Sequence, residues 1–255
     1  MTRQAIFMAD QHFPYINERM ERITLDYVNN NSEDIAEIIF GGDSVDNPAM
    51  SSFPQRAEDD TLLQEEVDTF IAHVNKYHLL VPKAKIRVIY GNHDNTRLNR
   101  TKSFNRSLSG LRNIKFDRIL RESIREQGFN FRITTGEKFR VFGTYFVHGD
   151  PRIDPYIKGG ITGARRTAEM HPEQGNMVMG HTHKVSTIPR LKGDTSLYVV
   201  GMMADIDSLS EQYKAYHGYQ NGFLVATELS RGKVQFDNIE VKRDQPLYMD
   251  GTVYD

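Results

Sequence analysis

Five short apolar runs in this chain are each followed at once by a group of aspartate, asparagine or histidine residues. The five groups are Asp10-Gln11-His12, Gly41-Gly42-Asp43-Ser44-Val45-Asp46, Gly91-Asn92-His93-Asp94, His148-Gly149-Asp150 and Gly180-His181-Thr182-His183. In open α/β folds, polar groups at the carboxyl ends of sheet strands converge on one crevice. The chain is therefore constrained to a fold that brings five strand ends together, and the candidate functional site lies between them.

The first half of the chain alternates apolar runs with longer amphipathic stretches. Residues 5–9, 35–40 and 86–90 are predicted to form buried strands, and helices are predicted around residues 20–28 and 63–77 between them. This order of strand, helix, strand, helix and strand favours a parallel sheet with right-handed crossovers.

The second half of the chain is richer in strands. Short apolar strands are predicted at residues 145–147, 177–179, 197–200, 223–226 and 234–239. Residues 129–133 and 139–142 flank Gly136 and predict a hairpin, and a helix is predicted at residues 161–171. The tail from Lys242 shows no periodicity. The simplest packing of all these elements is two sheets with helices on the outside.

The composition is that of an ordinary globular protein, and it excludes some classes of site. The chain has 255 residues, of which 38% are hydrophobic and 26% charged, and this suits a single α/β domain over residues 1–255. Cysteine is absent, so disulfides and thiolate metal sites are excluded. The net charge of −2 does not by itself indicate nucleic acid or membrane as a partner. Because no apolar run approaches about 18 residues and the first residues do not resemble a signal peptide, we expect a cytoplasmic protein with no membrane partner.

The side chains of the five groups are those of a metal site. Carboxylates, imidazoles and amide oxygens suit Mn²⁺, Fe, Zn²⁺ or Mg²⁺. Two histidines that are two residues apart in an extended segment, His181 and His183, point roughly the same way. Any one group has an ordinary explanation, since Gly-Asp after a strand is often only a turn. Independent turns would not gather so many histidines and aspartates at five successive strand ends.

As an ordered set, Asp-x-His, Gly-Asp-x-x-Asp, Gly-Asn-His-Asp, His and Gly-His-x-His resembles the calcineurin-like metallophosphoesterase family over residues 6–183. The resemblance implies an α/β fold, a four-layer α-β-β-α sandwich of two mixed sheets. The combination of Gly-Asn-His-Asp with Gly-His-Thr-His is similar to the phosphodiesterase and DNA-repair nuclease branches. The protein phosphatase branch has Gly-Asn-His-Glu and an arginine after the second motif, where this chain has Asn47 and Pro48.

The resemblance also implies two divalent metal ions, with Mn²⁺ expected first and Fe, Zn²⁺, Mg²⁺ or Ni²⁺ as alternatives. One ion would be held by Asp10, His12, Asp43 and His183, and the other by Asp43, Asn92, His148 and His181. His93 would act on the leaving oxygen of the substrate, and Asp94 would orient His93. Two such cations, about 3.5–4 Å apart, lower the pKa of a bridging water and clamp the phosphoryl oxygens. Asp46 and Asp150 are expected to support the site rather than bind metal, and His73 and His78 to lie at the surface or in packing.

A basic insert follows the third motif, at about residues 95–125. Its cations are Arg97, Arg100, Lys102, Arg106, Arg112, Lys115, Arg118, Arg121 and Arg125. Two interpretations stay open, a solvated helical face and a phosphate-binding surface for nucleic acid. Arg97 and Arg100 come just after His93 and are candidates to touch the substrate.

The expected function is hydrolysis of phosphate esters by a binuclear metal centre, with a phosphodiesterase or nuclease first. A phosphomonoesterase, including a protein phosphatase, is the alternative. A non-catalytic scaffold of the same fold is the remote one. The oligomeric state is left open.

Overall fold

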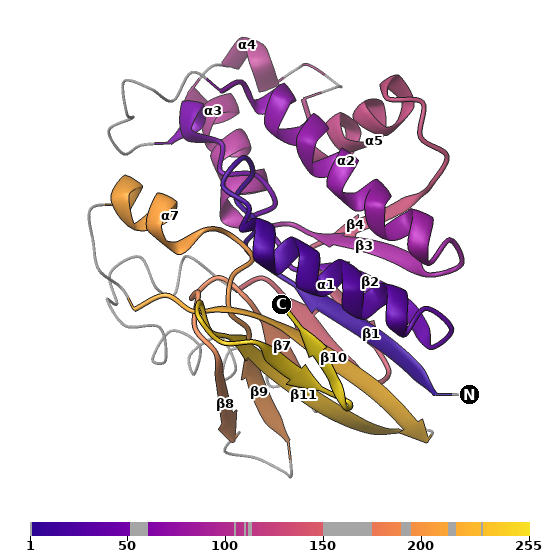
Figure 1. Cartoon of the computed structure of the whole chain (residues 1–255). Helices are drawn as coiled ribbons and strands as arrows, with labels where there is room; N and C mark the ends of the chain where they lie inside the picture. The colour runs from indigo at the N-terminus through magenta and orange to yellow at the C-terminus, as the bar shows by residue number, and fades with distance from the viewer. Residues whose placement is uncertain are drawn as a thin grey trace.

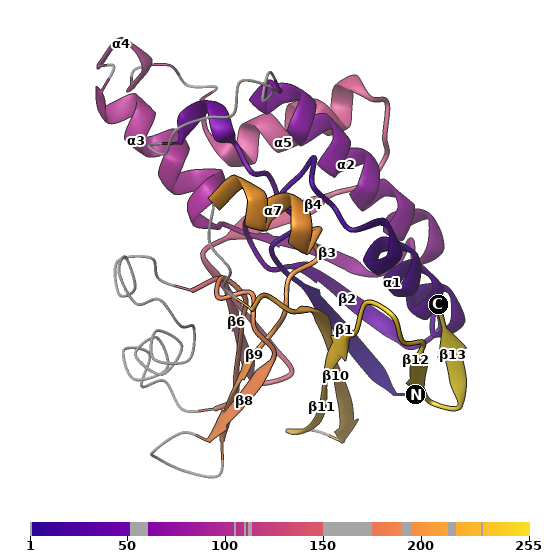
Figure 2. The ribbon, with the colours of Figure 1, turned by 60° about the vertical axis from the view of Figure 1, so that its left-hand side comes forward.

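The computed structural model describes residues 2–51, 61–104, 106–109, 111, 114–149, 175–189, 195–213, 218–230 and 232–255. Two mixed β-sheets lie face to face, with helices outside the first of them (Figures 1 and 2). This confirms the α/β class and the pair of mixed sheets predicted from the sequence. The helix predicted at 161–171 lies outside the described residues, so the described helical layer is the one over the first sheet.

The first sheet has six strands in the order β11-β10-β1-β2-β3-β4. Its strands are β1 (Arg3–Met8), β2 (Ile35–Phe40), β3 (Lys85–Ile89), β4 (Ile133–Gly136), β10 (Asn221–Ser230) and β11 (Lys233–Val241). β1, β2, β3 and β4 pair in parallel, whereas β10 and β11 add an antiparallel edge beside β1. The carboxyl ends of β1, β2 and β3 therefore lie side by side, as the strand and helix order predicts.

Helices cover one face of this sheet and bury apolar side chains in the core between them and the sheet (Figure 1). The helices of the first half are α1 (Glu18–Asn30), α2 (Leu63–Leu80), α3 (Arg97–Phe104), α4 (Arg106–Ser109) and α5 (Phe116–Glu126). Phe70 and Tyr77 of α2 stack edge-on against Phe40 of β2. His73 is buried in the same layer, and its Nδ1 lies 2.6 Å from Glu21 Oε1, which fits the predicted packing role.

The second sheet has five strands in the order β5-β6-β7-β9-β8. They are β5 (Lys138–Val141), β6 (Thr144–Val147), β7 (Met177–Met179), β8 (Ser186–Pro189) and β9 (Ser196–Val199). β6, β7 and β9 pair in parallel, and β5 and β8 are antiparallel edges. Phe7 of β1 meets Phe146 of β6 at a ring-centroid distance of 5.7 Å, so an apolar core joins the two sheets.

The predicted hairpin around Gly136 is wrong. β4 pairs in parallel with β3 in the first sheet, and β5 pairs with β6 in the second, so the chain changes sheets after Gly136. The real hairpin joins β5 and β6 through Phe142 and Gly143, which have φ of 48° and 78°. Two left-handed residues in succession form the turn that matches the twist of a tight hairpin.

Some elements were not predicted. They are the 3₁₀ turn η1 (Pro48–Met50), the π-turn η2 (Asn92–Thr96), α7 (Ile206–Tyr213) and the C-terminal hairpin of β12 (Leu247–Met249) and β13 (Thr252–Tyr254). β13 packs on α1, where Tyr254 and Tyr27 have ring centroids 6.0 Å apart. Among the described helices, none combines the length and apolar character needed to cross a bilayer.

Candidate metal centre

The nine predicted site residues lie together at the carboxyl ends of β1, β2, β3, β6 and β7. They are Asp10, His12, Asp43, Asn92, His93, Asp94, His148, His181 and His183. Hydrogen bonds or close polar contacts connect them, except for Asp94, which bonds to backbone amides of the loops between them. Both sheets contribute, so residues far apart in the sequence meet at one edge of the sandwich. Asp150 lies outside the described residues.

The first cluster joins Asp10, His12 and His183, all buried. His12 Nε2 lies 3.3 Å from His183 Nε2, and His183 Nε2 lies 3.3 Å from Asp10 Oδ1. Two ligand atoms bound about 2.0–2.2 Å from one cation are separated by roughly 3.0–3.4 Å at ordinary coordination angles. Within the described residues, no hydrogen bond reaches the buried Asp10 Oδ1. These atoms therefore have the spacing of ligands on one cation, and Asp10 Oδ1 has no hydrogen bond within the described residues that would compete with it.

The second cluster joins Asp43, His148 and His181. His148 Nε2 lies 3.2 Å from Asp43 Oδ2 and 3.1 Å from Asn92 Oδ1, again the separation of ligands on a common ion. Asp43 also groups with His12 and His93, so it stands between the two clusters. The structure thus brings together the residues that the family resemblance assigned to two ligand sets.

Two of the imidazoles are oriented for metal binding by the hydrogen bond on their other nitrogen. His12 Nδ1 lies 3.0 Å from Asp46 Oδ1, and His148 Nδ1 lies 2.9 Å from the carbonyl oxygen of Gly41. Both partners are acceptors, so each Nδ1 carries a proton and each Nε2 faces the cluster. This arrangement is usual for histidines that bind a metal.

The backbone at the candidate ligands is strained. Of the non-glycine residues with positive φ in the described chain, five are predicted ligands, namely Asp10, His12, Asp43, His181 and His183. Left-handed conformations at residues with a side chain concentrate at functional sites, where the surrounding structure enforces them. Close packing contributes here, because a Cβ on Gly91 would lie 2.1 Å from the backbone nitrogen and Oδ1 of Asp43. Only glycine lets the β3 end approach the β2 end so closely.

The electrostatics of the site favour a cation. Burial alone would lower the pKa of His148, but the carboxylate of Asp43 outweighs burial and raises this pKa to about 10. Burial lowers the pKa of His181 to about 4, with help from the charge of His148, which keeps His181 in the neutral form that binds metals. The ligand types, spacing, tautomers and field together fit a pair of divalent metal ions.

No family model and no curated protein matches this chain. Among solved structures, it is similar to a hypothetical protein from Pyrococcus horikoshii OT3, with 12% identity, TM-score 0.50, and coverage of 94% of this chain and 89% of that one. A conserved uncharacterized protein from Streptococcus pneumoniae TIGR4, a predicted phosphoesterase, matches with 13% identity, TM-score 0.37 and coverage of 89% and 83%. Vps29 from Entamoeba histolytica complexed with zinc matches with 12% identity, TM-score 0.43 and coverage of 93% and 98%. At these identities the likeness concerns the fold alone.

The two facing mixed sheets, the order of the motifs and the paired clusters decide the fold type. The chain has the calcineurin-like metallophosphoesterase fold.

In this metallophosphoesterase fold, the carboxylate that contacts the imidazole Nδ1 of His93 belongs to Asp46. Asp46 Oδ1 and the Asp46 carbonyl oxygen lie 3.0 Å and 2.9 Å from His93 Nδ1. Burial would raise the pKa of Asp46, but hydrogen bonds from His12 and His93 outweigh it and hold this pKa well below its usual range. One ionised carboxylate therefore supports both a candidate metal ligand and the candidate acid.

Asp94 does something else, and the prediction that it orients His93 is wrong. Asp94 Oδ1 accepts hydrogen bonds from the amides of Ser44 at 2.9 Å and Val45 at 3.2 Å, while its Oδ2 accepts from Gly91 N at 3.0 Å. Asp94 thus ties the loop after β2 to the loop after β3. The π-turn η2 turns consecutive side chains to different sides, so His93 and Asp94 do not meet.

Two further residues adjoin the site. Arg97 opens α3 and donates from Nη2 to His93 Nε2 at 3.1 Å. His93 and Arg97 are four positions apart, a spacing that puts side chains side by side on a helix. The sequence analysis named Arg97 as a candidate to touch the substrate because it comes just after His93. Tyr219 packs its ring against His183 at a centroid distance of 4.7 Å and also lines a cavity of about 450 Å³. No motif pointed to Tyr219.

Proposed function

We propose that this protein is a metal-dependent hydrolase of phosphate esters that acts on phosphodiesters. The observation that carries the proposal is the pair of ligand clusters that meet at Asp43, with His93 beside them. A non-catalytic scaffold of this fold would not need the buried imidazole of His93 beside the clusters, nor the Asp46 carboxylate that holds it.

The residues that would hold the metals follow from the clusters. Asp10, His12 and His183 would hold one ion and His148, His181 and Asn92 the other, with Asp43 between them. When bound, two such ions supply a nucleophile at neutral pH and neutralise charge on the phosphoryl group. We expect Mn²⁺, with Fe, Zn²⁺, Mg²⁺ or Ni²⁺ as alternatives.

The chain's own contribution to the chemistry centres on His93. Its N–H at Nδ1 is held by Asp46, which fixes the tautomer and turns Nε2 outward from that carboxylate. Nε2 lies 3.9 Å from Asp43 Oδ2, so it borders the space between the clusters. When the guanidinium of Arg97, which donates to this nitrogen in the structure, moves onto the substrate, a protonated Nε2 would give its proton to the oxygen that leaves the phosphorus. Burial of His93, which is 7% exposed, limits competition from bulk water.

The preference for diesters rests on the Gly-Asn-His-Asp and Gly-His-Thr-His pattern, and a polymeric diester is favoured by the basic surface of α5. Lys115, Arg118, Arg121 and Arg125 are all exposed, and their spacing of three or four residues sets them along one face of the helix. Partial burial lowers the pKa of Lys102, and the nearby charge of Lys115 lowers it further, so α3 and the start of α5 bring like charges together. Such clustered cations suit a run of phosphates.

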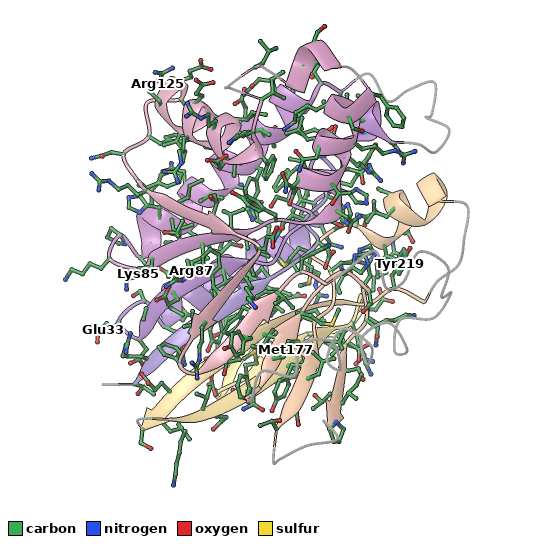
Figure 3. The ribbon with its side chains drawn as sticks, turned by 180° about the vertical axis from the view of Figure 1, so that it is seen from behind. Glu33, Lys85, Arg87, Arg125, Met177 and Tyr219 are labelled. Carbon is green, nitrogen blue, oxygen red and sulfur yellow. The ribbon has the colours of Figure 1, made fainter. Side chains whose placement is uncertain are left out.

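The basic face reaches far beyond the metal centre. Arg125 and Tyr219 lie on opposite sides of the view in Figure 3, and Tyr219 packs against the ligand His183. A small ester in the centre does not extend to Arg125, whereas a nucleic acid strand does. Nucleic acid is therefore our proposed partner.

The test is an activity panel with the Mn²⁺-loaded protein on bis-p-nitrophenyl phosphate, p-nitrophenyl phosphate, cyclic nucleotides, and single- and double-stranded DNA. A triple variant, Lys115→Gln, Arg118→Gln and Arg121→Gln, separates the roles of centre and basic face. It should weaken DNA cleavage and flatten its salt dependence, because each phosphate contact adds to the salt slope. Hydrolysis of bis-p-nitrophenyl phosphate should stay within about twofold.

The matched control removes three exposed cations elsewhere, with Lys83→Gln, Arg132→Gln and Lys233→Gln. DNA cleavage that falls equally in both triple variants would mean that net charge, rather than α5, matters. A wild-type protein that hydrolyses none of the esters with any of the five metals would refute the proposed function.

A further inference from the structure

Arg97 is held against the site by the loop that follows Asp46. Its Nη1 donates to the carbonyl oxygen of Asp46 and, at 3.2 Å, to that of Asn47, while Nη2 donates to His93 Nε2 at 3.1 Å. The guanidinium therefore contacts the imidazole nitrogen that faces away from the Asp46 carboxylate. An arginine in this place has a fixed position rather than the freedom of a surface cation.

The loop that holds Arg97, residues 46–47, is itself fixed by hydrogen bonds to Glu66 and His93. Asn47 has a left-handed backbone, with φ of 51°, and its amide donates to Glu66 Oε2 at 2.7 Å. Its side chain donates from Nδ2 to the carbonyl oxygen of His93 at 3.2 Å. Glu66 is 1% exposed, so a buried carboxylate fixes the loop whose carbonyl oxygens face Arg97. Glu66 thus fixes the loop, and the loop in turn holds the side chain of Arg97.

The carbonyl oxygens of Asp46 and Asn47 hold the guanidinium of Arg97 beside His93, although Arg97 comes from α3. We propose that Arg97 binds a phosphoryl oxygen of the substrate beside His93, and that the site therefore also accepts phosphomonoesters. This inference rests on the proposed phosphoesterase function and extends its substrate class.

The chemistry of the two ester classes explains the extension. A monoester dianion has three oxygens that are not esterified, and two metal ions clamp two of them. The third oxygen then needs a donor, and a guanidinium offers a charge-assisted one. A diester has only two such oxygens and one negative charge, so it depends less on Arg97.

The experiment compares Arg97→Gln and Arg97→Lys with the wild type. The control is Arg132→Gln, an exposed cation just before β4 and outside the basic insert. For Arg97→Gln, we expect kcat/KM for p-nitrophenyl phosphate to fall by about 10²-fold, in the range for loss of one preorganised donor. The loss for bis-p-nitrophenyl phosphate should stay below about tenfold. Arg97→Lys should recover part of the monoester activity, since lysine keeps the positive charge but lacks the planar set of donors that a guanidinium offers.

A second readout does not depend on turnover. Titration calorimetry of inorganic phosphate into the Mn²⁺-loaded protein should show at least about tenfold weaker binding for Arg97→Gln than for Arg132→Gln. Equal losses on the two esters with unchanged phosphate affinity would overturn the proposal and leave Arg97 as a support of the loop. Unchanged kinetics and phosphate binding in Arg97→Gln would overturn it as well. Failure of the proposed function is a different result, because the wild type would then hydrolyse neither ester.

Discussion

Asp46 holds His93 with two oxygens at once, its carboxylate and its backbone carbonyl, at 3.0 Å and 2.9 Å from the same imidazole nitrogen. For Asp46→Asn, we expect a kcat lower by about 10–100-fold, because an amide keeps the shape and loses the charge that fixes the tautomer. The loss should be greatest for alkoxide leaving groups. Metal content, measured by mass spectrometry, should fall only at the ion held by His12.

Asp94→Asn is the matched change at the neighbouring carboxylate, and it should act on stability. Asp94 accepts three backbone hydrogen bonds and does not contact His93, so the free energy of unfolding should fall by roughly 1–3 kcal/mol. Urea denaturation of the two variants measures this difference. If Asp94→Asn increased the dependence of kcat on the leaving group as strongly as Asp46→Asn does, the assignment of Asp46 to His93 would be wrong.

His93→Asn should keep both metal ions, because no ligand is removed from either cluster. We expect kcat to fall by about 10²–10⁴-fold with a poor, alkoxide-type leaving group. The loss should shrink for p-nitrophenolate, which scarcely needs a proton. A variant that binds one metal ion instead of two would show that His93 is a ligand.

Asp43→Asn should lose most bound metal and nearly all activity, since Asp43 stands between the clusters. The fall in activity should exceed about 100-fold, the upper range for residues that merely support a ligand. Asp26→Asn, at an exposed position on α1, is the control. Two metal ions per chain in Asp43→Asn would contradict the bridging position.

Glu66→Gln tests how the buried carboxyl group of Glu66, which accepts a hydrogen bond from the Asn47 amide, affects stability. Burial raises the pKa of Glu66 to about 8, from an ordinary value of 4.5. The folded protein thus keeps a proton that the unfolded chain releases between these pH values. The free energy of unfolding should therefore fall as pH rises through this window, by at most about 1.4 kcal/mol per pH unit.

Glutamine stays neutral, so the stability of Glu66→Gln relative to the wild type should increase from pH 5 to pH 8. Urea denaturation in EDTA measures this difference without bound metal. Glu126→Gln, on the exposed end of α5, is the matched control. A difference between Glu66→Gln and the wild type that does not change with pH would mean that Glu66 is already ionised at pH 5.

The gathering of the candidate ligands was predictable because it depends only on the ends of strands. Parallel strands place their carboxyl ends at one edge, so Asp10, Asp43 and Asn92 had to be neighbours once β1, β2 and β3 were recognised. His148 and His181 needed a second sheet facing the first, and the apolar strands β6 and β7 indicated one.

What the sequence did not predict depends on side-chain direction and on contacts between distant segments. The family resemblance implied that Asp94 orients His93, but the π-turn sends the two side chains to different partners. Gly136 looked like the turn of a hairpin, whereas it ends a strand that pairs with β3. The β12–β13 hairpin gains its stability from packing on α1, for example between Tyr254 and Tyr27, and has no periodic signal of its own.

The left-handed backbone at five candidate ligands has a consequence for how this protein can change. Each such residue opposes folding by about 1–2 kcal/mol compared with glycine, which adopts the conformation freely. Replacement of His12 or His183 by glycine would relieve that opposition and remove a ligand in the same step. Stability and ligand binding therefore make opposite demands at these positions, so a search for stabilising substitutions alone would remove ligands of the centre.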